Sequence, residues 1–103
     1  MQTRNLVTVA SIQMNCKLGD KEYNLSQAYA LIKKAVEKGA NLIVLPELFN
    51  TGYRVEESDV ELAETIPGET SDWMIKISQE FKLTIVSCIL EKDSVKGLIY
   101  DTA

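Results

Sequence analysis

With 103 residues, 46% of them hydrophobic and 25% charged, the chain has the size and composition of one soluble globular domain. A net charge of −4 and the lack of a Lys/Arg cluster exclude a surface built to bind nucleic acid, because phosphate binding requires a basic patch. No apolar run reaches the roughly 20 residues that span a bilayer. Two cysteines are too few for a disulfide framework, so we expect a cytoplasmic protein with free thiols.

The first predicted element is a strand over residues 6–14, which has apolar side chains on both faces. We therefore expect this strand to be largely covered on both sides. Gly19 and Asp20 separate it from an amphipathic helix, whose apolar stripe extends from Leu25 to Val36. Gly39 supplies the positive φ angle that commonly ends a helix, so the next strand begins near Asn41.

The second predicted strand contains four consecutive apolar residues, 42–45, and ends at a proline. Such a run is typical of a strand that is covered on both faces of a parallel sheet. Because Pro46 cannot donate a hydrogen bond to a neighbouring strand, we expect pairing to end there and Glu47 to follow the strand. The β-α-β order implies a right-handed parallel connection. Open α/β sheets bind ligands beyond the carboxyl ends of their strands, which is where Glu47 lies.

The remaining segment begins with an acidic, loop-like stretch over residues 51–69, which can form a short helix and contains a Pro67-Gly68 turn. We expect its acidic side chains, Glu56, Glu57, Asp59, Glu61 and Glu64, to form a solvated face. A second helix is predicted from Thr70 or Ser71, either of which can cap it, to Lys82. A buried strand over residues 84–90 follows. A short polar loop leads to a last strand from Leu98, which should pair with it in antiparallel orientation.

Glu47 is the first candidate for chemistry. A carboxylate between a buried strand and the apolar pair Leu48-Phe49 is partly desolvated, which raises its pKa and suits a general base or acid near neutral pH. The alternative is a structural glutamate that caps a helix or pairs with a lysine. Tyr53 and Phe49 are candidates for lining a substrate pocket beside Glu47, with loop packing as their alternative role. Asn50 can form a hydrogen bond within its own loop.

Other kinds of site are not predicted. The chain has no histidine and no close pair of cysteines, so no metal site is expected. The first strand-to-helix turn contains only Gly19, and a phosphate-binding loop needs several glycines; we expect no cofactor. Cys88 lies in the middle of a strand, where we expect it to be packed. Cys16 follows the first strand at the same sheet edge as Glu47, but it has no histidine to activate it.

The block Leu45-Pro46-Glu47-Leu48-Phe49, followed by Thr51-Gly52-Tyr53, resembles the glutamate motif of the nitrilase, or carbon-nitrogen hydrolase, superfamily. Three other segments resemble the same family in order and spacing. These are residues 9–14 (its first strand), the helix that ends in residues 37–40 (its first helix) and residues 100–103 (the strand before its catalytic lysine). The resemblance covers essentially the whole chain.

This resemblance implies an α/β fold that is the N-terminal part of a four-layer αββα sandwich, with residues 1–103 as one incomplete domain. It implies that Glu47 is the general base, and that the family's lysine and nucleophilic cysteine lie beyond Ala103. The implied reaction is hydrolysis of a non-peptide C–N bond in a small amide, N-carbamoyl compound or nitrile. The chain by itself is then expected to be inactive, and a homodimer or larger assembly is expected.

A different class of function remains open, namely a non-catalytic α/β binding or assembly module. Leu98, Ile99 and Tyr100 neither cover nor charge the edge of the last strand, so we expect the isolated chain to self-associate. A receiver-like or flavin-binding domain is a weaker alternative. It would need an acidic pair or a phosphate loop after the first strand, and residues 15–19 contain neither.

Overall fold

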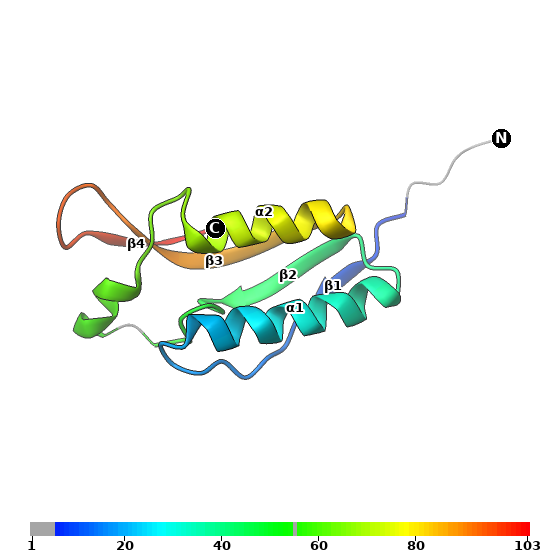
Figure 1. The fold of residues 1–103 in the computed structure, drawn as a ribbon, viewed down its shortest axis with the longest axis horizontal. Coiled ribbons are helices and arrows are strands. Elements are labelled where there is room, and N and C mark those ends of the chain that lie inside the picture. The colour runs from blue at the N-terminus through cyan, green and yellow to red at the C-terminus, as the bar shows by residue number, and fades with distance from the viewer. Residues whose placement is uncertain (1–5, 55) are drawn as a thin grey trace.

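The computed structural model describes residues 6–54 and 56–103, and it contains one mixed sheet with two helices (Figure 1). The elements are β1 (Val9–Ser11), α1 (Lys21–Glu37), β2 (Leu42–Glu47), the 3-10 helix η1 (Glu57–Leu62), α2 (Glu69–Phe81), β3 (Thr84–Lys92) and β4 (Ile99–Thr102). The sheet order is β1-β2-β3-β4. The first three strands are parallel, and β4 is antiparallel to β3. The predicted α/β class and the predicted order of elements are confirmed.

Both helices contribute to a single core that lies against one face of the sheet. Ile32 of α1 and Ile77 of α2 are buried with Ile43 and Leu45 of β2. The alternate residue of β2, Val44, is only half-buried, and its partner on β3, Val86, is 43% exposed. Because paired residues of adjacent strands share a face, the side of the sheet opposite the core is open in this chain.

The first strand differs from its prediction in length and in burial. It contains three residues, which pair with residues 42–44 of β2, and Val9 is 55% exposed on the open face. Residues 6–8 precede the start of β2 in register, so they have little strand to pair with. The expectation of a strand over residues 6–14 covered on both sides is therefore wrong for the described chain.

The second strand continues through its proline. Pairing with β3 shifts register between Val44 and Glu47, and it resumes with Glu47 opposite Cys88. An irregularity of this kind accommodates a residue that cannot donate a ladder hydrogen bond. The expectation that pairing ends at Pro46 is thus wrong, and the consequence is that Glu47 lies beside β3.

The ends of the helices follow from local chemistry. Asp20 caps α1 by accepting a hydrogen bond from the Tyr23 amide at 3.0 Å, and Gly39, with φ of 89°, follows the helix as predicted. The cap of α2 is Gly68, whose amide donates to Ser71 Oγ at 2.8 Å. Neither Thr70 nor Ser71 is the cap residue, because the helix already begins at Glu69 and Thr70 is buried inside its first turn.

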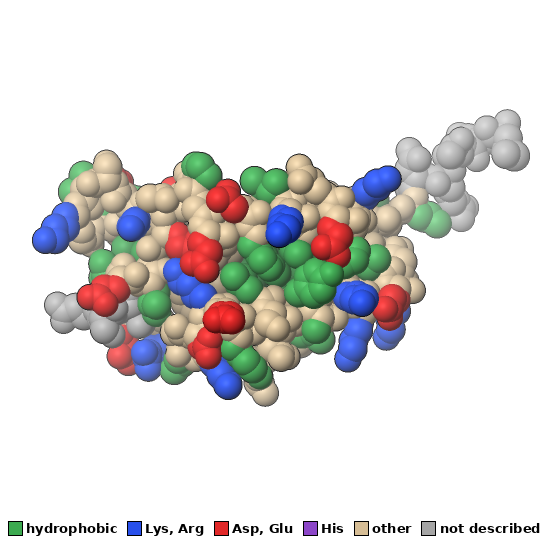
Figure 2. All heavy atoms as spheres, in the orientation of Figure 1, with side chains coloured by type: hydrophobic (Ala, Val, Ile, Leu, Met, Phe, Trp, Pro, Cys, Tyr) green, Lys and Arg blue, Asp and Glu red, His purple; other side chains and the backbone are tan. Residues whose placement is uncertain are grey.

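The surface in the view of Figure 2 mixes both signs of charge around a central group of hydrophobic side chains, between the positions of α1 and α2. No broad basic patch is visible on this face. Neither helix of the described ranges is long and apolar enough to cross a membrane.

Candidate functional site

Glu47 stands at the start of a tight turn that joins β2 to the acidic segment. Leu48, the next residue, is 2% exposed and has φ of 55°, which is uncommon for a residue other than glycine. Its amide donates to the Cys88 carbonyl at 2.8 Å, and its own carbonyl accepts from the Gly52 amide at 2.8 Å. Residues held in sparsely populated conformations concentrate at functional sites, where the surrounding structure maintains them.

A pocket of about 300 Å³ adjoins the Glu47 side chain. Its lining consists of Glu47, Leu48, Tyr53, Arg54 and Asp101. Asp101 belongs to β4, more than fifty positions along the chain, and the antiparallel pairing of β4 with β3 carries it to this edge of the sheet. No local pattern in the sequence indicated Asp101, because its position depends on the register of that pairing.

The carboxyl groups of Glu47 and Asp101 are neighbours in this pocket and interact through a side-chain hydrogen bond. This hydrogen bond, followed by partial removal from water and by the charge of Asp101, raises the pKa of Glu47 above its ordinary value. The direction is the predicted one, but the main cause is different: the Glu47 side chain is exposed, and the neighbouring carboxyl has the larger effect.

Cys88 lies closer to Glu47 than the sequence suggests, as a result of the register shift in β2. It is half-buried, and burial, then the charges of Asp101 and Glu47, raise the pKa of its thiol. Burial likewise raises the pKa of the half-buried Cys16. A nucleophilic cysteine needs the opposite shift, so neither environment favours a reactive thiolate.

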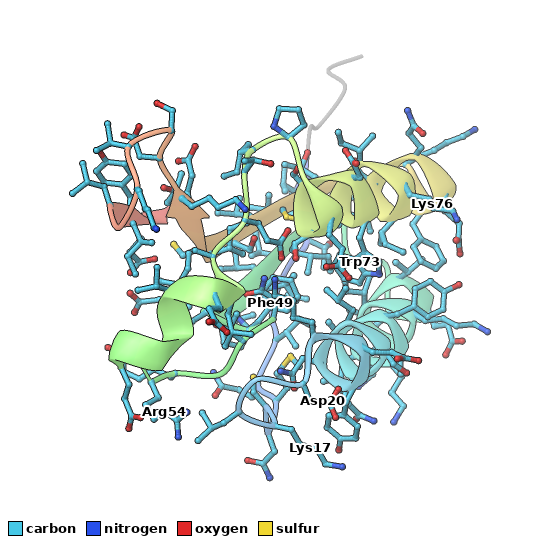
Figure 3. All side chains as sticks on the ribbon, turned by 60° about the vertical axis from the view of Figure 1, so that its left-hand side comes forward. Lys17, Asp20, Phe49, Arg54, Trp73 and Lys76 are labelled. Atoms are coloured by element: carbon cyan, nitrogen blue, oxygen red, sulfur yellow. The ribbon has the colours of Figure 1, made fainter. Side chains whose placement is uncertain are left out.

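The two predicted substrate-binding residues lie in different surroundings. Tyr53 is 75% exposed and lines the pocket. Phe49 is fully buried and packs against Trp73 of α2, with 5.8 Å between ring centroids. Figure 3 shows Phe49 inside the molecule facing Trp73, whereas Arg54 lies at the periphery. The position of Phe49 thus favours its alternative role, packing beneath the turn.

Glu64 is a second residue of interest that the sequence did not indicate. The expectation of a solvated face describes Glu56 and Glu61, which are exposed, but it is wrong for Glu64, which is 7% exposed; the side chains of Glu57 and Asp59 lie outside the described part. Ala63, next to Glu64, is also buried. This apolar residue shortly before the Pro-Gly turn was the feature of the sequence that could have indicated a buried position here.

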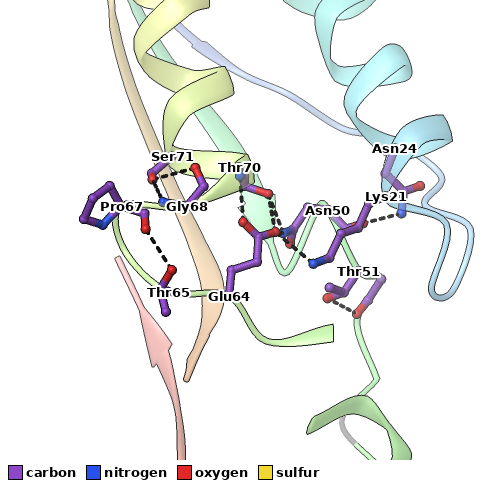
Figure 4. A network of polar contacts seen from close by, with 11 residues as sticks. Lys21, Asn24, Asn50, Thr51, Glu64, Thr65, Pro67, Gly68, Thr70 and Ser71 are labelled. Atoms are coloured by element: carbon purple, nitrogen blue, oxygen red, sulfur yellow. Dashed lines mark hydrogen bonds and ion pairs between the residues drawn. The ribbon is translucent and has the colours of Figure 1, made fainter. Parts of the chain in front are cut away.

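The Glu64 carboxylate is surrounded by donors (Figure 4). The Thr70 amide and hydroxyl each donate to it at 2.6 Å, Asn50 Nδ2 donates at 3.1 Å, and Lys21 Nζ lies 3.0 Å away. Burial acts to raise the pKa of Glu64, but the hydrogen bonds from Thr70 and the interactions with Lys21 together hold it below its ordinary value. Asn50 was expected to form a hydrogen bond within its own loop. Its Nδ2 group donates instead to Glu64 and to Thr70 Oγ1.

Within residues 6–54 and 56–103, no group of three or more His, Cys, Asp or Glu side chains is arranged to hold a metal ion.

The known proteins that this chain resembles in sequence belong to one family. A family model described as carbon-nitrogen hydrolase matches residues 8–103. A nitrilase of Pyrococcus abyssi is 41% identical over 101 residues, which cover 95% of this chain and 38% of that protein. The omega-amidase NIT2 of Xenopus tropicalis is 39% identical over 83 residues, which cover 80% of this chain and 29% of that protein. The chain thus spans well under half the length of these relatives.

Two solved structures share the fold. Nit3 of Saccharomyces cerevisiae, a member of the nitrilase superfamily, superposes with a TM-score of 0.78 at 29% identity, covering 92% of this chain and 37% of that one. A carbon-nitrogen hydrolase of Helicobacter pylori superposes with a TM-score of 0.80 at 22% identity, covering 92% and 33%. The predicted fold class, the N-terminal part of a nitrilase-like α/β sandwich, is confirmed.

Proposed function

This chain belongs to the carbon-nitrogen hydrolase family, and on that premise we propose that it contributes the general base, Glu47, to hydrolysis of a non-peptide C–N bond. The substrate class is a small amide, N-carbamoyl compound or nitrile. The relatives described as a nitrilase and an omega-amidase support the nitrile and the amide within this range. We also propose a cytoplasmic location and a homodimeric or larger assembly.

The observation that supports this proposal most is the position of the Glu47 carboxyl. It lies at the carboxyl end of β2, lines a pocket, and shares a hydrogen bond with Asp101 that raises its pKa. A carboxylate with a raised pKa takes up a proton more readily near neutral pH, as a general base must do when a nucleophile attacks. It can then return that proton to the departing amine.

The family resemblance implies two further groups, a lysine that stabilises the tetrahedral intermediate and a cysteine that attacks the substrate carbon. Neither Cys16 nor Cys88 has the low-pKa environment of such a nucleophile. We therefore propose that residues 1–103 alone are inactive. Turnover of amide or N-carbamoyl substrates by the purified 103-residue chain, abolished by Cys16→Ala, would contradict this.

Tyr53 is the proposed substrate contact. Its side chain lines the Glu47 pocket and is largely exposed, so it is available to an incoming ligand. Phe49 supports the site from the core side by packing on Trp73.

A chimera tests the role of Glu47. Residues 8–103 replace the matching third of the Pyrococcus abyssi nitrilase, and amide, N-carbamoyl and nitrile substrates are supplied in turn. We expect a folded, active chimera that loses nearly all activity with Glu47→Gln and retains it with Glu37→Gln, a control at an exposed position of α1. A folded Glu47→Gln chimera that keeps its activity would remove Glu47 from the mechanism.

A second candidate function is a non-catalytic module that assembles with another copy of this chain. The specific observation in its favour is the open face of the sheet, where Val9 and Val86 are 55% and 43% exposed. Burying such apolar surface favours association. Sedimentation velocity of the 103-residue chain tests this candidate, since a monomer at all accessible concentrations would contradict the assembly module.

A further inference from the structure

Glu64 connects four parts of the molecule that are distant in sequence. Its side chain binds Lys21 at the start of α1, Asn50 in the turn after Glu47, and Thr70 in the first turn of α2. Its backbone pairs with the end of β3, because its amide donates to Leu90 and its carbonyl accepts from Lys92, at 2.9 and 2.8 Å. The three side-chain contacts converge on the Glu64 carboxylate (Figure 4).

Stability of the fold does not by itself account for a buried charge at this position. Removing a carboxylate from water is unfavourable, and a buried ion pair is often no more stabilising than well-packed apolar side chains of similar volume. What distinguishes the Glu64 network is its location, since it fastens the turn that begins with Glu47.

The turn is held at both ends. On the β3 side, the Leu48 amide donates to the Cys88 carbonyl at 2.8 Å. On the other side, Asn50 is fixed twice: its Nδ2 donates to Glu64, and its carbonyl accepts from Asn24 Nδ2 at 2.9 Å. Leu48, the strained residue, thus carries the first attachment on its own amide and lies two positions before the second, at Asn50. If the Asn50 attachment is released, Leu48 can relax toward negative φ, and the Glu47 carboxyl can move away from Asp101.

We infer that Glu64 is a positioning residue for Glu47, holding the turn after β2 so that the Glu47 carboxyl faces Asp101 in the pocket. The inference rests on the proposed role of Glu47 as the functional carboxylate. Glu64 itself does not line the pocket, so it acts through Asn50 and not on a substrate.

The test is Glu64→Gln in the 103-residue chain, with Glu61→Gln as matched control. Gln has the same shape as Glu, but its amide group must face one of the donors now bound to Glu64. Glu61 lies in the same segment and is exposed. The readout is the titration of the Glu47 carboxyl carbon by NMR, together with the urea midpoint of unfolding.

We expect Glu64→Gln to lower the apparent pKa of Glu47, because separation from Asp101 removes the hydrogen bond that raises it, and we expect Glu61→Gln to leave it unchanged. A lower urea midpoint with an unchanged Glu47 titration would mean that Glu64 is purely structural, and would overturn the inference.

If Glu64→Gln does not fold, Asn50→Ala decides. This change removes the Nδ2 donor that binds Glu64 but keeps the backbone carbonyl that accepts from Asn24 Nδ2. A fall in the pKa of Glu47 supports the inference, and no fall overturns it. None of these readouts uses enzymatic activity, so an inactive chimera would count against the proposed function without affecting this result.

Discussion

Replacing Thr70 by valine measures how strongly the Glu64 network stabilises the fold. Thr70 is fully buried, and its hydroxyl donates to Glu64 at 2.6 Å and accepts from Asn50 at 2.9 Å. Valine has nearly the same shape, so Thr70→Val removes these hydrogen bonds without opening a cavity. The Thr70 amide still donates to Glu64. A hydrogen bond to a charged group contributes about 1.5–3 kcal/mol, so we expect the free energy of unfolding to fall by about 2 kcal/mol.

The assay is urea denaturation at neutral pH. If the free energy of unfolding falls by about 1.5 kcal/mol for each molar of urea, a loss of about 2 kcal/mol lowers the urea midpoint by about 1.3 M. Thr84→Val is the matched control, because Thr84 is exposed at the start of β3 and its substitution should change the free energy by less than about 0.5 kcal/mol.

The same denaturation at acid pH tests whether the charge of Glu64 is responsible for this stabilisation. The pKa of Glu64 is lower in the folded protein than its ordinary value of 4.5, so its charged form stabilises the fold above that pH, and this stability is lost as the pH falls through the folded pKa. The difference between the unsubstituted protein and Thr70→Val should therefore shrink in acid. A deficit below about 0.5 kcal/mol at neutral pH, or one that is the same in acid, would refute the reasoning.

Three further changes test the site and its turn. Asp101→Asn should lower the pKa of Glu47, because it removes the hydrogen bond and charge that raise it; NMR titration measures this, and an unchanged pKa would assign the shift to another cause. Gly52→Ala should destabilise the protein more than Gly39→Ala in urea denaturation, and equal losses would contradict this. Both glycines have positive φ, but an added Cβ at Gly52 would lie 2.7 Å from the Leu18 side chain, whereas nothing lies within 4 Å of one at Gly39. At Gly39 only the backbone strain of a left-handed residue remains, so Gly39→Ala should lower the free energy of unfolding by about 1 kcal/mol. Glu47→Gln should speed alkylation of Cys88 by iodoacetamide, because it removes a charge that raises the thiol pKa, and an equal rate would show that the two groups do not interact.

Local patterns in the sequence were sufficient for most elements of this fold. The apolar stripe from Leu25 to Val36 predicts α1, and the positive φ at Gly39 follows from its place after that helix. The short loop before Leu98 predicts the antiparallel pairing of β4 with β3. The block around Glu47 carried the family, because a strand end, a proline and a particular turn occur there within a few consecutive residues. Each of these signals depends on neighbours in the chain.

Only the tertiary structure decided which side chains meet at the site. Asp101 reaches Glu47 because of the register between β3 and β4, and Cys88 does so because of the register shift at Pro46. Glu64 lies in an acidic segment that is typical of a solvated surface, yet it is buried where α1, α2 and the Glu47 turn converge. The identity of a charged residue does not reveal whether donors from distant segments will surround it. Register and convergence are long-range properties, and they decide both the pKa of Glu47 and the burial of Glu64.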